Sequence, residues 1–418
     1  MEPTELIKEH TANGTFLVST LSVRGVERTV YAFYENGSAA ELFCLPSGGS
    51  SILGNIYVGK VKNIAANINA AFIEIGDGQL CYYALDAGET PVFTTPKKKK
   101  ELAAGDELLV QVSREAVKTK APTVSGNLNF AGKYLVLTSG KRHLGLSSKL
   151  TSAERERLRA IAEPFLGDDF GIIVRTNAAG ISEEDLRQEL KELTETYRRT
   201  VETGRNQTCF SLVYREPSAY TARLRGLRTD SYDKILTDRP EIYEELRDYL
   251  TLHQPEDLPK LSFYEKTAPS LDSVYGLSKA LEDALKERVW LKSGGYLVIQ
   301  PTEALTVIDV NTGKYTGKKK KSDTFLKINL EAAREAARQL RLRNLSGIIV
   351  ADFIDMDREE DNRTLLSVLA SELKRDPVKA TLVDMTPLGL VEITRKKVQK
   401  TLAEQVQEWV RISKKSVK

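Results

Sequence analysis

Cysteine and histidine are scarce in this chain, and their scarcity limits the kinds of metal site and nucleophile that it can contain. The 418 residues include only three cysteines and three histidines. Cys44, Cys81 and Cys209 lie far apart and form no C-x-x-C pair, which argues against a disulfide framework and a zinc site and fits a reducing compartment. The histidines are equally isolated. We therefore expect any catalytic site to depend on other side chains.

Long apolar runs are also missing. No segment approaches the roughly 20 apolar residues that span a membrane, and the N-terminus lacks the apolar core of a signal peptide. We therefore expect a cytoplasmic protein, with about two to four domains and no membrane partner. The net charge of +3 is too small to identify nucleic acid as a partner, so the local clusters Lys97–Lys100, Lys118–Lys120 and Lys318–Lys321 are more informative.

Two apolar runs near the C-terminal end of the chain each carry a carboxylate close to their ends. They are Leu305–Asn311 and Gly347–Asp355, and the segment between them has apolar residues at helical spacing. Both runs are β-branched and apolar throughout, which is typical of strands buried on both faces. A strand, a crossover helix and a second strand predict two parallel strands in one sheet.

Adjacent parallel strands, about 4.8 Å apart, bring Asp309 and Asp352 to the same edge of that sheet, where open α/β sheets bind their ligands, so the two carboxylates could share one cation. Asn311 projects to the same face as Asp309 and is placed to orient its carboxylate. Two carboxylates together with substrate phosphate oxygens are a usual way of holding Mg²⁺. The alternative is that both are ordinary acids at the ends of strands.

The segments before this unit suggest nucleic-acid contacts. Gly14–Leu21 and Thr29–Tyr34 predict strands that are too few to close a core alone. Residues 52–120 have the short strands of a small barrel, in which Phe72 points away from the apolar face. Such a ring is a candidate stacking platform for a base, unless it lies under a neighbouring domain.

A further α/β unit is predicted over residues 121–215. Its strands include Lys133–Thr138 and Gly171–Thr176, and Thr151 and Ser182 begin helices. Arg175 and Thr176 at a strand end offer a guanidinium and a hydroxyl to a phosphate, or are merely the polar end of a strand.

The remaining expectations concern secondary structure alone. We expect a hairpin formed by Gly295–Gln300 and Leu305–Val310, helices at Pro240–Leu252, Val274–Val289 and Arg363–Lys374, a strand at Ala380–Val383, and a final helix from about Glu392 to Val410.

Several short motifs resemble the bacterial ribonuclease E/G family, in family order, between about residues 16 and 400. They are Gly54-Asn-Ile-Tyr-x-Gly-Lys-Val, Ala70-Ala-Phe, Tyr134-Leu-Val-Leu, Ile173-Val-Arg-Thr, Ser293-Gly-Gly-Tyr-Leu-Val-Ile, Thr302-Glu-Ala-Leu-Thr-x-Ile-Asp-Val-Asn-Thr-Gly, Asn329-Leu-Glu-Ala-Ala, Ala337-Arg-Gln-Leu-Arg-Leu-Arg, Gly347-Ile-Ile-Val-x-Asp-Phe-Ile-Asp-Met and Gly389-Leu-Val-Glu-Ile-Thr-Arg-Lys. Any single motif is weak evidence for the family, whereas the complete set in this order is specific to it.

The resemblance implies an α/β multidomain fold. Its expected parts are an RNase-H-like domain in two segments (1–50 and 216–284), an OB-fold RNA-binding domain (51–125), a 5′-sensor domain (126–215), a deoxyribonuclease-I-like catalytic domain (285–400) and a C-terminal helix (401–418). The N-terminal segment then completes its core with the second RNase-H-like segment.

The resemblance also implies roles for individual residues. Asp309 and Asp352 match metal-binding catalytic aspartates, and Asn311 matches the asparagine that supports the first of them. Arg175, Thr176 and the backbone of Val136 match a 5′-monophosphate pocket. Phe72, Tyr82 and Lys120 match RNA-contact positions of the OB-fold, where Tyr82 replaces a phenylalanine.

The implied activity is a Mg²⁺-dependent endoribonuclease that cleaves single-stranded, A/U-rich RNA and favours 5′-monophosphorylated ends. Its partners would be rRNA precursors or mRNA, in rRNA processing or mRNA decay. One alternative is a non-catalytic RNA-binding protein in ribosome assembly or RNA protection, although an intact carboxylate pair speaks against it. A nuclease acting on DNA or hybrids is another, disfavoured by the OB-fold and end-sensor matches.

The chain departs from the family pattern after Lys400. The family's C-x-x-C zinc-link is replaced by Thr401–Trp409, which has no cysteine, and the chain stops before the small domain that usually follows. We therefore expect no zinc and no dimer built on a zinc-link. A homodimer remains possible, for example through the amphipathic final helix and Trp409.

Overall fold

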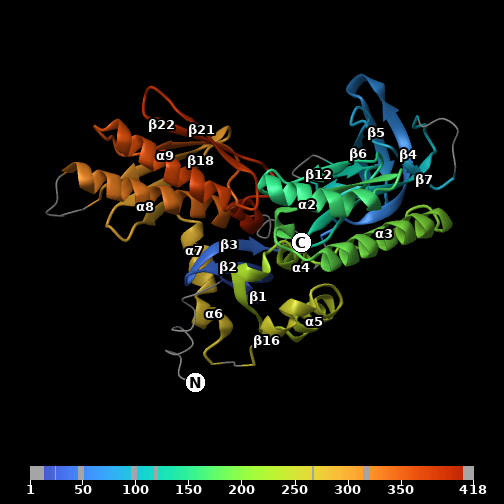
Figure 1. Cartoon of the computed structure of the whole chain (residues 1–418), viewed down its shortest axis with the longest axis horizontal. Coiled ribbons are helices and arrows are strands. Elements are labelled where there is room, and N and C mark those ends of the chain that lie inside the picture. The colour runs from blue at the N-terminus through green and yellow to red at the C-terminus, as the bar shows by residue number, and fades with distance from the viewer. Residues whose placement is uncertain are drawn as a thin grey trace. The chain divides into compact units, whose positions relative to one another are not determined.

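The computed structural model describes residues 14–23, 25–45, 51–95, 101–116, 121–265, 268–313 and 321–407, with the side chains of 321–323 excepted (Figure 1). The chain forms two compact units, the first from Met1–Gly49 and Thr229–Lys418 and the second from Ser50–Arg228. The first unit is therefore interrupted in sequence by the second. Four expected features lie wholly or mainly outside the described residues, namely Lys97–Lys100, Lys118–Lys120, Trp409, and Lys318–Lys321, of which only the backbone of Lys321 is described. None of the described helices is long and apolar enough to cross a membrane.

A six-stranded sheet in the first unit contains both expected carboxylate strands. Its order is β17-β18-β19-β20-β22-β21. β19 and β20 are parallel and are connected through a long helix, and β18 and β19 form the expected hairpin, so both topology predictions are confirmed. The elements are β17 (Arg288–Trp290), β18 (Tyr296–Pro301), β19 (Leu305–Asn311), α8 (Lys321–Leu342), β20 (Gly347–Asp352), α9 (Glu359–Lys374), β21 (Ala380–Met385) and β22 (Leu390–Arg395).

The prediction that these strands are buried on both faces is wrong. Burial alternates along β19, with Ile308 and Val310 buried in a core that includes residues of α8 and α9. The residues between them face the other way, and in β20 the side chain of Ile348 is 53% exposed. An uninterrupted apolar run therefore does not distinguish a strand covered on both faces from one covered on a single face.

Two helix predictions are also wrong. The segment expected to start the final helix forms β22, because Val391 and Ile393 alternate into the core and buried Arg395 binds buried Asp376 at 2.7 Å. The helix that follows covers residues 402–407 within the described chain. The region 274–289 is likewise divided into α6 (Leu271–Tyr275), α7 (Leu277–Ala284) and β17, since Gly276 at φ +64° ends α6.

The N-terminal strands belong to a five-stranded sheet of order β16-β15-β1-β2-β3, in which β1 and β15 are parallel. Leu402 and Val406 are buried in the core of this sheet, so these two side chains are not available to a dimer interface. The elements are β1 (Gly14–Val23), β2 (Val26–Glu35), β3 (Ser38–Cys44), β15 (Tyr232–Thr237), α5 (Pro240–His253) and β16 (Leu261–Phe263).

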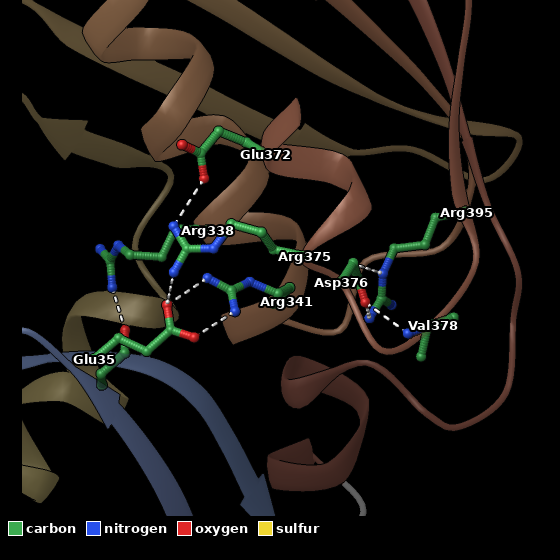
Figure 2. Close-up of polar contacts among 9 residues, drawn as sticks. Glu35, Arg338, Arg341, Glu372, Arg375, Asp376, Val378 and Arg395 are labelled. Atoms are coloured by element: carbon green, nitrogen blue, oxygen red, sulfur yellow. Dashed lines mark hydrogen bonds and ion pairs between the residues drawn. The ribbon is translucent and has the colours of Figure 1, made fainter. Parts of the chain in front are cut away.

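Glu35 links this five-stranded sheet to the helices of the six-stranded sheet (Figure 2). Its carboxylate accepts two hydrogen bonds from Arg341 of α8, at 2.9 and 3.0 Å, and one from Arg375 at 3.0 Å. Arg338 donates to the backbone carbonyl of Ala39 in β3. Arg341 is buried, and removing one partner of a buried ion pair costs about 3–5 kcal/mol. These bonds therefore help to hold the two sheets of the first unit together.

The second unit contains a small barrel. Strands β4, β5, β6, β9 and β8 pair in sequence, and β8 pairs back with β4, which closes the ring. This closed five-stranded barrel is consistent with the expected OB-fold. Its strands are β4 (Ile56–Ala65), β5 (Ala70–Glu74), β6 (Leu80–Ala84), β8 (Glu107–Arg114) and β9 (Thr123–Ser125), with β7 (Val92–Phe93) and β14 (Leu212–Tyr214) added at the edges.

A four-stranded sheet of order β10-β11-β13-β12 forms the rest of the second unit together with its helices. Thr151 and Ser182 accept the backbone N–H groups of Glu154 and Asp185, so both predicted helix starts are confirmed. The elements are β10 (Asn129–Ala131), β11 (Leu135–Ser139), β12 (Leu144–Leu146), α2 (Ser152–Ala162), β13 (Phe170–Val174), α3 (Glu183–Asn206) and α4 (Ala219–Arg225).

Candidate active site

Asp309 and Asp352 are direct neighbours in the six-stranded sheet. They form a Cα pair in the parallel register of β19 and β20, so their side chains project from the same face. Asp309 is half-buried and Asp352 is exposed, whereas the residues beside them in sequence, Ile308 and Ala351, are buried against the helices. We call the surface that carries both acids the carboxylate face. The predicted meeting of the two carboxylates is therefore confirmed.

Asn311 supports the first of these acids. Its Nδ2 atom donates to Oδ2 of Asp309 at 2.7 Å. Residues two apart on a strand share a face, which is why the sequence spacing was sufficient to predict this contact. The bond holds the Asp309 carboxylate in one orientation and leaves its other oxygen to a further ligand.

The electrostatics of the pair favour a cation. The pKa of Asp352 is raised, first by partial desolvation of its carboxylate at the sheet surface and then by the negative charges of Asp309 and Asp355. Among the described residues, neither Asp309 nor Asp352 forms an ion pair, and no group of three or more His, Cys, Asp and Glu side chains is arranged to hold a metal. Within the described part of the chain, two repelling carboxylates without a cationic partner are an arrangement that could hold a divalent cation, with water and substrate as its other ligands.

The barrel presents an aromatic pair on its outside. Phe72 of β5 and Tyr82 of β6 are opposite each other in the register, with ring centroids 6.4 Å apart in an edge-to-face arrangement. Both are half-buried and lie on the face opposite the buried Ile73 and Cys81. The backbone N–H of Tyr82 donates to the carbonyl of Pro122. Lys120, which precedes this proline by two positions, lies outside the described residues.

Arg175 and Thr176 immediately follow β13. The Arg175 backbone N–H donates to the Tyr134 carbonyl at 2.7 Å, and its Nη1 donates to the Gly132 carbonyl at 2.6 Å. The Thr176 hydroxyl is 2.8 Å from that of Ser147. Val136 lies in the adjacent strand β11, opposite Ile173. The three predicted residues therefore gather around one end of the β11–β13 pair.

Sequence reasoning missed the residues that support Arg175. The carboxylate of Glu189 in α3 accepts the backbone N–H groups of Tyr134 and Leu135, at 3.0 and 2.9 Å. It thereby fixes the backbone next to Gly132, whose carbonyl holds the Arg175 guanidinium. A glutamate within the apolar stripe of an amphipathic helix is a signal that could have identified Glu189, whereas nothing in the sequence indicates Ser147.

Glu189 provides a pH-dependent test of this support. Burial raises its pKa from the usual 4.5 to about 7, against the opposing effect of the backbone hydrogen bonds and Arg175. The folded state thus binds the proton of Glu189 more tightly than the unfolded chain does. The contribution of the protonated carboxyl to the free energy of unfolding is therefore fully present below pH 4.5 and is lost as the pH rises to about 7. The loss is on the order of 3 kcal/mol.

We expect Glu189→Gln to abolish this part of the pH dependence, because the amide does not titrate. Urea unfolding between about pH 5 and pH 7 measures it as the difference between wild type and variant. Glu195→Gln, at an exposed position of the same helix, is the control. Parallel pH profiles for wild type and Glu189→Gln would contradict the prediction.

Comparison with known proteins identifies relatives of this chain. The model of the ribonuclease E/G family matches residues 129–398. Ribonuclease G of Haemophilus influenzae is 34% identical over 385 residues, which cover 90% of this chain and 78% of that protein. Ribonuclease G of Escherichia coli K12 is 35% identical with the same coverage of both chains. Ribonuclease E of Synechocystis is 35% identical over 364 residues, which cover 86% of this chain and 54% of that protein.

Proposed function

This chain belongs to the ribonuclease E/G family of endoribonucleases, and we propose that it cleaves single-stranded RNA with a Mg²⁺ ion held by Asp309 and Asp352. The observation that carries the proposal is the in-register placement of these two carboxylates on adjacent parallel strands. Their mutual repulsion, together with the hydrogen bond from Asn311 to Asp309, supports a role in binding a cation.

Each residue of the pair has a defined task in this proposal. Asp309 and Asp352 would hold the ion through their carboxylate oxygens, and Asn311 would fix the orientation of the Asp309 carboxylate through its hydrogen bond. A Mg²⁺ ion bound there supplies positive charge to the scissile phosphate and lowers the pKa of a water molecule for attack. Because Asp352 is exposed at the end of β20, an RNA strand can approach the carboxylate face from solvent.

The second unit supplies contacts that hold the RNA. Phe72 and Tyr82 present a pair of rings for base stacking, which is worth about 1–3 kcal/mol per base. Lys120 adds a cation for the backbone. Arg175, Thr176 and the backbone of Val136 bind a 5′-monophosphate, since a guanidinium fork and a hydroxyl match phosphate oxygens. The substrates proposed are A/U-rich, 5′-monophosphorylated RNAs in rRNA processing or mRNA decay.

The test is cleavage of a short A/U-rich RNA with a 5′-monophosphate, with and without Mg²⁺, beside DNA of the same sequence. We expect cleavage of the RNA only, and only with Mg²⁺. RNA binding without cleavage under any divalent cation would instead identify a non-catalytic RNA-binding protein. Equal cleavage of the DNA would contradict the proposed substrate.

A further inference from the structure

An aromatic and cationic group lies beside the carboxylates, at the β17 edge of the same sheet. The ring of Trp290 is 64% exposed and lies 5.1 Å from that of Tyr296, at an interplanar angle of 57°. The Arg288 guanidinium lies over both rings, 4.5 Å from the Tyr296 centroid and 5.8 Å from that of Trp290. An exposed tryptophan held by a cation and a second ring is a preorganised surface for a planar ligand.

The strand register places this group on the carboxylate face. Trp290 pairs with Tyr296, and Tyr296 pairs with Asn311. Arg288 pairs with Val298, which in turn pairs with Asp309. Directly paired residues project to the same side of a sheet.

The opposite face confirms this orientation. Val289 and Leu297, which alternate with these residues, pack into the core formed with α8 and α9. The sheet therefore presents two adjacent rows on its carboxylate face. One row runs from Trp290 through Tyr296 to Asn311, and the other runs from Arg288 through Val298 to Asp309 and Asp352.

The spacing suits neighbouring parts of one nucleic-acid strand. At roughly 4.8 Å per strand, β17 lies about 10 Å from β19, which carries Asp309, and about 14 Å from β20, which carries Asp352. A base flanking the scissile bond can therefore reach the rings while its phosphate lies at the carboxylates. Arg288 contributes a positive charge that attracts the phosphate backbone to the carboxylate face, where Asp309 and Asp352 are negatively charged.

We propose that Arg288, Trp290 and Tyr296 form a nucleotide-binding subsite that stacks a base of single-stranded RNA next to the bond aligned at Asp309 and Asp352. The inference rests on the proposed function and adds a binding site within the catalytic unit itself. We identify the ligand as a nucleic acid for two reasons. Every base has a π-face that can stack on the Trp290 ring, and the strand register places Trp290 and Arg288 in the same rows as Asn311 and Asp309. The subsite accepts different bases, since stacking does not read their edges.

Trp290 is also the probe for the test. The chain has only two tryptophans, so Trp290 is the only one left in a Trp409→Phe background. We expect an unlabelled single-stranded RNA to quench its fluorescence, and Asp309→Asn in that background to be quenched equally. Quenching requires binding alone, so it distinguishes failure of the subsite from failure of the proposed cleavage activity.

Affinity provides the second readout. We expect Trp290→Ala to weaken RNA binding on the order of 10-fold, measured by fluorescence anisotropy, and Trp290→Phe to restore most of the loss. Val383→Ala removes another exposed apolar side chain of the same sheet, 55% exposed on β21, and is expected to bind RNA like wild type.

Two outcomes would overturn the subsite. The first is RNA binding without quenching and with unchanged affinity in Trp290→Ala. The second is unchanged RNA affinity accompanied by a dimer-to-monomer shift of Trp290→Ala in sedimentation equilibrium, which would assign the surface to a second copy of the chain.

Discussion

Asp309→Asn is expected to reduce the rate of RNA cleavage by a factor on the order of 10³ or more, while RNA affinity stays nearly unchanged. The amide keeps the shape of the side chain and removes the negative charge that the cation requires. Asn311 donates to Oδ2 of Asp309, so the substitution also turns this hydrogen bond into a contact between two amides. Single-turnover cleavage and equilibrium RNA binding measure the two effects separately.

Matched variants make this prediction specific. Asp352→Asn is expected to behave in the same way, because its carboxylate is the register partner of Asp309. Asp384→Asn removes an exposed carboxylate from β21 of the same sheet and is expected to cleave at the wild-type rate. Undiminished cleavage by Asp309→Asn would refute the assignment of the metal, and a parallel loss of RNA binding would indicate a structural role.

Arg175→Ala is expected to remove the preference for 5′-monophosphorylated RNA over the same RNA with a 5′-hydroxyl. Hydrogen bonds to a charged group contribute about 1.5–3 kcal/mol, so the preference should fall by a factor on the order of 10–100. Cleavage of the 5′-hydroxyl substrate should change little, since it has no phosphate to bind. The ratio of kcat/KM for the two substrates measures the effect.

Arg199→Ala controls for the loss of one positive charge from the same unit, because Arg199 is exposed on α3. It is expected to leave the ratio unchanged. The Arg175 side chain also donates a hydrogen bond to the carbonyl of Gly132, so the main alternative to phosphate binding is a purely structural role for Arg175. An equal loss of activity on both substrates would show that Arg175 holds the loop together and does not bind the end.

The parts of the fold that sequence could predict are those specified by neighbouring residues. The hairpin of β18 and β19 follows from two β-type runs joined by a short turn, and a long amphipathic segment between two apolar runs requires a parallel pair. The side-chain caps at Thr151 and Ser182 are specified within three residues of each helix start.

Predictions failed where long-range packing decides the structure. The local sequence of residues 390–395 is compatible with a helix. The segment forms β22 because it pairs with β20 on one side and with β21 on the other. The sequence also contains no sign that α8 and α9 cover only one face of the six-stranded sheet. In both cases the deciding partner is remote in sequence.

The candidate site shows the same division. Asp309 and Asn311 were predictable from a spacing of two residues, and Asp352 from the parallel crossover. Trp290 was not, because its position beside Asn311 depends on the antiparallel register of β17 with β18. Arg288 and Tyr296 become neighbours only through that same register.

Metal binding by the carboxylate pair can be measured without any RNA. Mn²⁺ accepts the same oxygen ligands as Mg²⁺ and is detected by electron paramagnetic resonance, so a titration counts the ions bound to each variant. Wild type and Asp384→Asn are predicted to bind a Mn²⁺ ion that Asp309→Asn and Asp352→Asn do not. Equal binding by all four proteins would contradict a shared cation between Asp309 and Asp352.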